Sequence, residues 1–324
     1  MSEFDLTELK DSIIKESQFI NHINTSIRKV IIGQDDLIEK LILAILTDGH
    51  VFLEGVPGLA KTLTINSLAK LIDTKFQRLQ FTPDLLPADI LGTLIYNPKE
   101  GTFEVKKGPI FANIILADEI NRTPPKTQSA LLEAMQEKSV TNAGKTYNLD
   151  KPFFVLATQN PIEQEGTYPL PEAQLDRFMF NVVLDYPSYD EEVQIVKQTT
   201  SGILTTLNTI MNSEDIIKYQ DLIRRIPVAD NVLEYVVSLV TKTRPNSDQD
   251  ENDMIQYIEW GAGPRASQFM LLAAKCHAAI NGKYSPDIED VKAVAKPILR
   301  HRLVKNYKAE AEGISVDNII ENLM

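Results

Sequence analysis

Cysteine, tryptophan and histidine are scarce: the 324-residue chain holds one, one and four of them. A single cysteine, Cys276, permits no disulfide within the chain. No apolar run approaches the roughly 18 residues that a membrane-spanning helix needs, so we expect no membrane insertion. The acidic first residues lack the basic and apolar regions of a signal peptide. Together these absences predict a cytoplasmic protein.

Positive charge is also in short supply. Lys and Arg number 33 against 45 Asp and Glu, which gives a formal net charge of −12. An acidic surface repels phosphate backbones, so nucleic acid is not the expected partner. The four histidines are scattered, and the adjacent pair Cys276 and His277 lacks the spacing of a metal site. The chain is long enough for two domains with separate cores.

One stretch carries the clearest chemistry. Residues 54–62 read Glu-Gly-Val-Pro-Gly-Leu-Ala-Lys-Thr, and they lie between an apolar run and an amphipathic run, in the order strand, tight loop, helix. Backbone N–H groups of such a loop and the positive end of the helix dipole together bind phosphate. In this P-loop, Lys61 would reach the β- and γ-phosphates of a bound triphosphate, and Thr62 would help to hold Mg²⁺. The one departure is Ala60, which stands where glycine is usual.

We assign nucleotide binding to the loop, to the start of the helix after it and to an apolar segment ahead of it. That segment, residues 30–33, could form an adenine pocket, although packing in the core would explain its apolar character equally well. The assigned residues are Ile32, Gly33, Gly55, Val56, Pro57, Gly58, Leu59, Ala60, Lys61, Thr62 and Leu63.

A second constellation lies at the end of another apolar run. Residues 112–117 predict a strand buried on both faces, as in a parallel sheet covered by helices. Asp118 and Glu119 follow it directly, and ligands of open α/β sheets bind at this edge, so both acids are expected to face the P-loop. We assign Mg²⁺ to Asp118 together with Thr62, and the orientation and polarisation of the attacking water to Glu119. Combined with a P-loop, the two acids predict nucleotide hydrolysis rather than binding alone.

The next apolar strand, residues 153–158, brings Asn160 to the same edge. Its amide could hydrogen-bond the γ-phosphate or the water, or it could simply form the turn before Pro161. Two hairpins are predicted around the turn residues 97–101 and 142–144. A projecting hairpin could be a working part of a nucleotide-driven protein or a surface decoration.

These motifs resemble, in order and spacing, those of AAA+ ATPases. The amino-acid sequences of the P-loop and of residues 116–122, Leu-Ala-Asp-Glu-Ile-Asn-Arg, are similar to those of the MoxR family, in which alanine is tolerated before the lysine. The resemblance covers nearly the whole chain, because residues 175–178, Leu-Asp-Arg-Phe, and residues 261–267 also match.

The resemblance implies three further roles. Asn160 corresponds to the sensor 1 residue, Arg177 to the arginine finger and Arg265 to the sensor 2 residue. For Arg177 an alternative is an ion pair with Asp176 or Glu172 that fixes its own helix. The hairpins correspond to the helix-2 and pre-sensor-1 insertions of the family.

The expected fold is α/β, with a P-loop αβα core around a central parallel sheet over residues 1–186. Past it, helical periodicity continues without strands, which predicts an all-α lid over residues 187–324. The resemblance implies a ring, commonly a hexamer, that acts as a chaperone with von Willebrand factor A domain proteins to mature, remodel or activate client complexes. The alternative is a nucleic-acid motor of helicase-like type, favoured only by Lys106 and Lys107 on the first hairpin. A GTPase is less favoured, because no Asn/Thr-Lys-x-Asp guanine signature occurs.

Overall fold

The computed structural model describes residues 13, 17–18, 20–56, 58–99, 101–142, 144–162, 166–201, 206–245 and 253–324. The chain forms two compact units, which are described separately. The P-loop unit comprises His22–Pro171 and Val182–Ile217. The helical unit comprises Glu172–Asn181 and Lys218–Met324, together with the described residues before His22. Residues 172–181 thus cluster with the C-terminal part of the chain, whereas the predicted boundary lies at residues 186 and 187.

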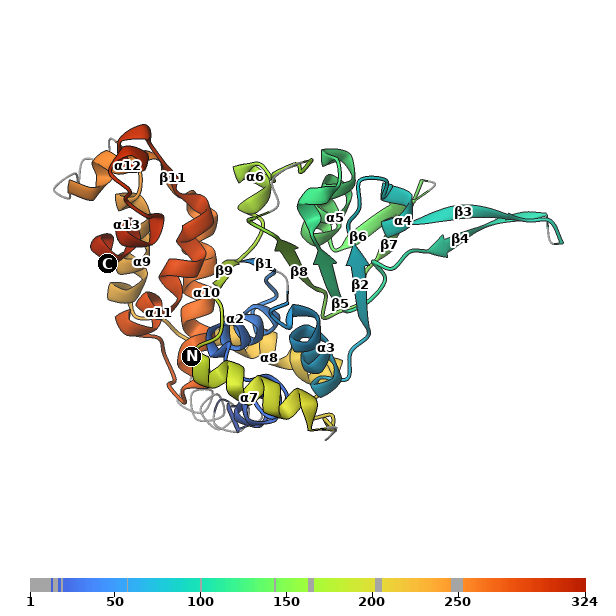
Figure 1. Ribbon diagram of the computed structural model, residues 1–324, viewed down its shortest axis with the longest axis horizontal. Coiled ribbons are helices and arrows are strands. Elements are labelled where there is room, and N and C mark those ends of the chain that lie inside the picture. The colour runs from blue at the N-terminus through green and yellow to red at the C-terminus, as the bar shows by residue number, and fades with distance from the viewer. Residues whose placement is uncertain are drawn as a thin grey trace. The chain divides into compact units, whose positions relative to one another are not determined.

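The P-loop unit is built on a five-stranded sheet in the order β2-β5-β8-β1-β9. The pairs β2 and β5, β5 and β8, and β8 and β1 are parallel. Strands β5 and β8 are apolar and buried on both faces, as a parallel sheet covered by helices requires. The predicted α/β fold with a central parallel sheet is confirmed (Figure 1). The strands are β1 (Val51–Gly55), β2 (Phe76–Gln80), β5 (Ile114–Asp118), β8 (Phe154–Gln159) and β9 (Phe180–Leu184).

Helix α3 begins at Lys61, after β1 and the loop, so the predicted order of strand, loop and helix is present. Helix α7 begins with a capping box, in which the Ser188 backbone N–H donates to Glu191 Oε2 at 2.8 Å. The helices of this unit are α2 (Asp35–Leu46), α3 (Lys61–Leu71), α4 (Pro87–Leu91), η1 (Ile120–Arg122), α5 (Pro125–Glu137) and α7 (Tyr189–Thr200).

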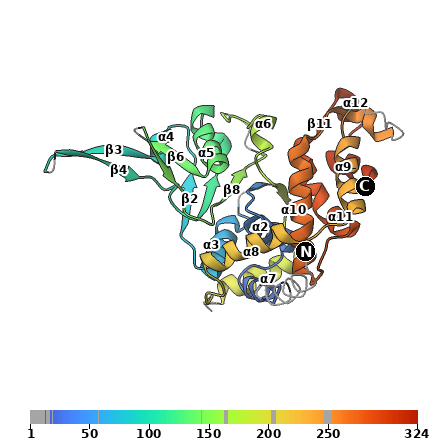
Figure 2. The same cartoon turned by 180° about the vertical axis from the view of Figure 1, so that it is seen from behind.

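Both predicted hairpins are present and antiparallel. The first, β3 (Gly92–Asn97) with β4 (Thr102–Lys107), extends away from the sheet of its unit (Figures 1 and 2). Along one of its faces, opposite pairs are apolar, since Leu94 pairs with Val105 and Tyr96 with Phe103. The second hairpin is β6 (Ser139–Asn142) with β7 (Lys145–Asn148), and its turn residue Ala143 lies outside the described residues.

The helical unit also holds one short antiparallel pair of strands, β10 with β11, which is too short for a period-two signal in the sequence. Helix α8 (Ser213–Arg225) has residues in both units, since the P-loop unit ends at Ile217 and this unit resumes at Lys218. Over the described part of the chain, no helix is both long and apolar enough to cross a bilayer. The elements are α6 (Glu172–Leu175), α9 (Asp230–Lys242), η2 (Asp253–Tyr257), β10 (Ile258–Trp260), α10 (Pro264–Ile280), α11 (Ile288–Leu299), η3 (Arg300–Arg302), β11 (Val304–Lys305), α12 (Tyr307–Ala311) and α13 (Val316–Leu323).

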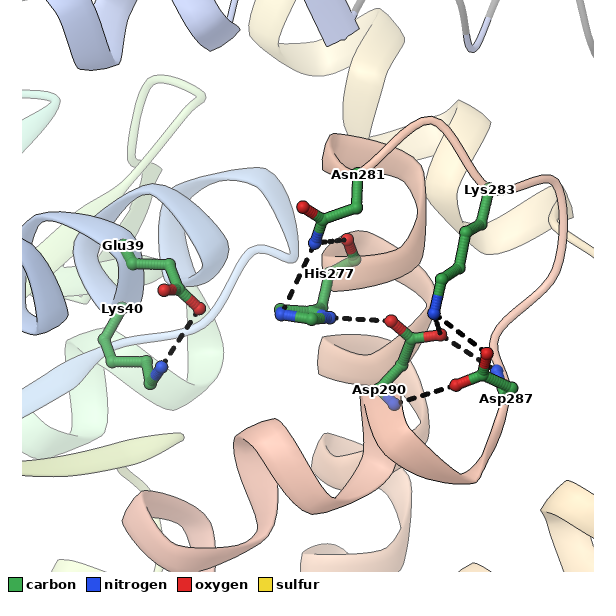
Figure 3. Close-up of polar contacts among 7 residues, drawn as sticks. All are labelled: Glu39, Lys40, His277, Asn281, Lys283, Asp287 and Asp290. Carbon is green, nitrogen blue, oxygen red and sulfur yellow. Dashed lines mark hydrogen bonds and ion pairs between the residues drawn. The ribbon is translucent and has the colours of Figure 1, made fainter.

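A polar cluster ties α10 to α11 (Figure 3). The buried Asp290 carboxylate accepts from His277 Nδ1 at 2.7 Å and from Lys283 Nζ at 3.1 Å. The backbone N–H of Asp287 donates to the same carboxylate at 2.9 Å. A hydrogen bond from Lys283 and one from the backbone of Asp290 lower the pKa of Asp287 to about 2. A buried charge is tolerated here because each carboxylate oxygen is hydrogen-bonded.

Candidate functional site

The loop between β1 and α3 is held in an uncommon backbone conformation. Gly58 has φ +89° and Ala60 has φ +53°, both in the left-handed region. A side chain at such a φ costs about 1 kcal/mol, which explains why glycine is usual where Ala60 stands. Gly55 is required for a different reason, because a Cβ there would come within 2.9 Å of Leu184 Cβ.

This loop opens onto a cavity of about 460 Å³ at the carboxyl edge of the sheet, here called the phosphate pocket. Its lining brings together the P-loop, the two acids after β5 and the polar residues at the end of β8. From the sequence, these groups were expected at one edge only because ligands of open α/β sheets bind at the carboxyl ends of the strands. Val56 lies outside this lining, and Pro57 lies outside the described residues. The lining residues are Gly55, Gly58, Leu59, Ala60, Lys61, Thr62, Leu63, Arg78, Gln80, Asp118, Glu119, Thr158 and Asn160.

Lys61 carries the positive charge of the loop in a half-buried position. Its Nζ donates to the carbonyl of Gly55 at the end of β1. Burial lowers the pKa of Lys61, while the carboxylates of Asp118 and Glu119 act in the opposite direction. The ammonium group is therefore held close to the two acids, at the mouth of the loop that would receive a phosphate.

Asp118 has two polar partners in the pocket. Arg78 donates to its Oδ2 from Nη2 at 2.6 Å and from Nε at 3.1 Å. Thr158 donates its hydroxyl to Asp118 Oδ1 at 2.7 Å. The carboxylate is thus aimed into the pocket by strands on both sides of β5.

Glu119 stands on strained backbone, with φ +57°. Left-handed non-glycine residues cluster at functional sites, where surrounding contacts hold them. The Glu119 carboxylate accepts from Gln80 Nε2 at 3.0 Å and from Arg122 Nε at 2.7 Å. Its backbone N–H donates to Thr158 Oγ1 at 2.9 Å.

Sequence reasoning missed Arg78, Gln80 and Thr158. Arg78 and Gln80 alternate along β2 and so share one face of it, but that pattern does not say which strand lies beside β2. The register of β2 against β5, with Gln80 opposite Asp118, is what brings both side chains to the acids. Thr158 sits at the end of β8, where the same edge rule that selected Asn160 could have found it.

Asn160 is buried and lines the phosphate pocket. Its Oδ1 accepts from the backbone N–H of Ile162 at 3.1 Å, which is the turn interaction expected of an asparagine before proline. The amide nitrogen is the donor of the same side chain. The turn therefore occupies the amide oxygen, and the two interpretations of Asn160 do not exclude each other.

A second cavity, of about 360 Å³ and mainly apolar, adjoins the first within the same unit. Ile32 and Gly33 line it, together with Leu59 and Leu63 of the loop region, which also line the phosphate pocket. Gln34 Nε2 donates to the carbonyl of Leu59 at 2.7 Å and ties the segment to the loop. A base could enter this apolar pocket while its phosphates enter the other, which favours the adenine interpretation over core packing.

The remaining two candidates, Arg177 and Arg265, belong to the helical unit. Arg265 Nη1 donates to Asp176 Oδ2 at 2.9 Å, and Asp176 Oδ1 accepts from Arg302. Asp176 therefore pairs with these two arginines, and among the residues that the structure describes no acceptor pairs with the Arg177 guanidinium. The alternative in which Asp176 or Glu172 pairs with Arg177 is not the arrangement found.

Comparison with known proteins also identifies an ATPase domain and a lid domain. Residues 50–180 match the ATPase family associated with various cellular activities (AAA), and residues 253–323 match the AAA lid domain. The chain is 44% identical to the uncharacterised protein YeaC of Bacillus subtilis, over 94% of this chain and 92% of that one. It is 43% identical to chaperone MoxR1 of Mycobacterium tuberculosis, over 92% of this chain and 79% of that one.

A solved structure agrees as well. The crystal structure of a candidate ATPase from Cytophaga hutchinsonii superposes with a TM-score of 0.90 and 46% identity, over 98% of this chain and 97% of that one. A match over 98% of this chain spans both the P-loop unit and the lid. The chain belongs to the MoxR family of AAA+ ATPases.

Proposed function

We propose that this ATPase hydrolyses ATP with Mg²⁺ and works as a ring on a client protein complex, which it matures, remodels or activates. The observation that carries the proposal is the convergence of Lys61, Thr62, Asp118 and Glu119 on one pocket beside an apolar one. A cation, a hydroxyl and two carboxylates are the groups that phosphoryl transfer to water requires.

The donor set of the pocket fits Mg²⁺. Thr62 and Asp118 supply the hard oxygen atoms that this ion prefers. The described residues contain no cluster of three or more His, Cys, Asp or Glu that could hold a metal by themselves, which suits an ion bound partly by nucleotide phosphates. When bound, Mg²⁺ would neutralise charge on the β- and γ-phosphates. Asp118 would then hold the ion in place of Arg78, which pairs with its Oδ2 in the structure.

The other residues act through their own atoms. Lys61 leaves the Gly55 carbonyl to pair with the phosphates, and the backbone N–H groups of loop residues 58–60 bind them from the other side. Glu119 orients the attacking water and takes up its proton once Gln80 and Arg122 release the carboxylate. Asn160 donates its amide to the γ-phosphate or to the water. Arg265 is the sensor 2 residue of the proposal.

Assembly into a ring supplies Arg177 in trans. A site at one edge of a sheet leaves the γ-phosphate open on one side, and a neighbouring subunit would close it. The fixed charge and planar fork of arginine suit it to the charge that develops there. In support, none of the acceptors in the described chain holds the Arg177 guanidinium. A hexamer, and von Willebrand factor A domain proteins as adaptors or clients, complete the proposal.

The chaperone role rests on the named relative, chaperone MoxR1. A cytoplasmic location is also proposed, on the single cysteine and the acidic composition. A helicase-like motor is not favoured, since the chain carries a net charge of −12 and Lys107 Nζ lies 4.8 Å from the centre of the Phe111 ring.

Two substitutions test the proposed hydrolysis. Glu119→Gln keeps the size of the side chain but removes the base, so ATP should bind while turnover falls by at least about a hundredfold. Lys61→Ala should abolish ATP binding itself, because the phosphates lose their cation. Equilibrium binding of ATP and release of phosphate separate the two effects. Glu133→Gln on the exposed side of α5 is the matched control and should change neither.

Turnover in Glu119→Gln equal to that of the unchanged protein would remove Glu119 from this role. Undiminished ATP affinity in Lys61→Ala would show that the loop is not the phosphate site.

A further inference from the structure

Arg302, the last residue of η3, is a charged side chain with only 2% of its surface exposed. Its Nε donates to Asp176 Oδ1 at 2.7 Å. Its Nη2 donates to the carbonyls of Asp176 at 2.9 Å and Phe178 at 2.6 Å. Its Nη1 donates to the carbonyls of Met179, at 3.3 Å, and Ile298. A guanidinium has five N–H donors, and each one here has an acceptor.

Four of these five acceptors belong to one short segment, residues 176–179, which contains Arg177. Three of the four are backbone carbonyls, so Arg302 fixes the course of the chain and not only a side chain. Lysine could not do this, because its ammonium group is a point donor without a planar fork.

The rest of η3 holds the same segment. His301 Nε2 donates to the carbonyl of Phe178 at 3.0 Å, and Arg300 Nη1 donates to the carbonyl of Asn181 at 2.7 Å. Burial lowers the pKa of Arg302 to about 10, with Asp176 acting in the opposite direction, so the guanidinium stays charged near neutral pH. Burial and the neighbouring Arg302 charge lower the pKa of His301, which leaves that imidazole neutral.

We propose that Arg302 is a positioning residue for hydrolysis: it fixes residues 176–179 of its own subunit so that Arg177 is presented in one place to the site of the next subunit. This rests on the proposed trans role of Arg177. A misplacement of about 1 Å in a catalytic group can cost on the order of a hundredfold in rate, so a loosened segment weakens the finger even though Arg177 itself is intact. None of the five acceptors of Arg302 belongs to a residue that lines the phosphate pocket.

Mixed assemblies separate these two roles. Subunits with Lys61→Ala have no ATP site but an intact finger, whereas subunits with Arg177→Ala have an intact site but no finger. The reference mixture of the two should regain ATPase activity, because some interfaces then combine a good site with a good finger. The proposal concerns what Arg302→Lys does when it is placed on each side of that interface.

On the finger side, the double variant Lys61→Ala/Arg302→Lys mixed with Arg177→Ala should restore at least about tenfold less activity than the reference mixture. On the site side, Arg302→Lys alone mixed with Lys61→Ala should regain activity, which an unfolded variant could not do. The matched control is Arg300→Lys, placed in the Lys61→Ala subunit. It removes a fork of the same η3 helix but leaves the contacts of residues 176–179, so it should still supply fingers.

Three results would overturn the proposal. Full restoration by Lys61→Ala/Arg302→Lys would show that the finger does not need Arg302. Failure of Arg302→Lys on both sides of the interface would show that it maintains the fold in general. Failure of the reference mixture itself would remove the trans finger, and with it the function of Arg302, and only this result counts against the proposed function.

Discussion

The Arg302–Asp176 pair of the helical unit differs in burial from the arginine–carboxylate pairs of the phosphate pocket. In the P-loop unit, the side chains of Arg78 and Arg122, which hold Asp118 and Glu119, are 48% and 37% exposed. In the helical unit, the Arg302 side chain that holds Asp176 is 2% exposed. An exposed guanidinium regains water when it leaves its partner, whereas a buried one loses hydrogen bonds that nothing replaces. The acids of the phosphate pocket can therefore change partners, and the segment that carries Arg177 cannot.

The largest expected effect comes from breaking the buried pair. Asp176→Ala leaves the charges of Arg302 and Arg265 without their counter-ion, although the backbone carbonyls around Arg302 remain, so the helical unit should lose about 3 kcal/mol of stability. Hydrogen exchange of the α10 amides reports the opening of this unit alone.

The matched control for that substitution is Asp317→Ala. Asp317 makes a two-pronged pair with Arg300 at 2.8 Å for both contacts, but the Arg300 side chain is 20% exposed and the Asp317 side chain 35%. Its loss should cost about 1 kcal/mol. If Asp176→Ala costs no more than Asp317→Ala, burial does not distinguish the two pairs.

The two units also differ in how much of them could be predicted from the sequence, and the phosphate pocket was easier to predict than the contacts of Arg302. The P-loop and the acids after β5 follow from local pattern and from the rule that ligands bind where parallel strands end. Arg78 and Gln80 needed the order of strands in the sheet, which no local pattern gives. The contacts of Arg302 could not be predicted from the sequence, because its carboxylate partner lies 126 residues earlier. Most of its acceptors are backbone carbonyls, which every residue type carries.

The P-loop unit also buries a titratable side chain, His50, but its imidazole ring is neutral, whereas the buried Arg302 is charged. His50 Nδ1 accepts from the backbone N–H of Val155 at 3.2 Å, so the proton is on Nε2, which faces the carbonyl of Met135 at 3.3 Å. Burial lowers the pKa of His50 from 6.5 to about 4. The unfolded chain therefore binds the proton first, and stability is full above pH 6.5 and is lost as the pH falls towards 4.

Between pH 7 and pH 5 this loss should reach about 2 kcal/mol in the P-loop unit. Hydrogen exchange of the β8 amides, corrected for the intrinsic dependence of exchange on pH, measures it. His50→Gln should flatten the pH dependence even where it lowers stability at neutral pH, whereas His22→Gln, at an exposed position, should leave the dependence unchanged. A slope that persists in His50→Gln would assign the acid sensitivity to other groups.

The smallest expected effect is the one at the exposed pair. Arg78→Ala removes the partner of Asp118, but the Arg78 side chain is 48% exposed and Asp118 keeps its hydrogen bond from Thr158, so the P-loop unit should lose no more than about 1 kcal/mol. Mg²⁺-dependent binding of ATP should be unchanged or slightly tighter, because Asp118 no longer has to give up an arginine before it can hold the ion. Titration with ATP at several Mg²⁺ concentrations tests this, with thermal unfolding as the measure of stability. A loss of ATP affinity of more than about tenfold, roughly 1.4 kcal/mol, would mean that Arg78 contacts the phosphates itself. Arg78 would then pair with Asp118 only in the absence of nucleotide, and that pairing would not oppose Mg²⁺ binding.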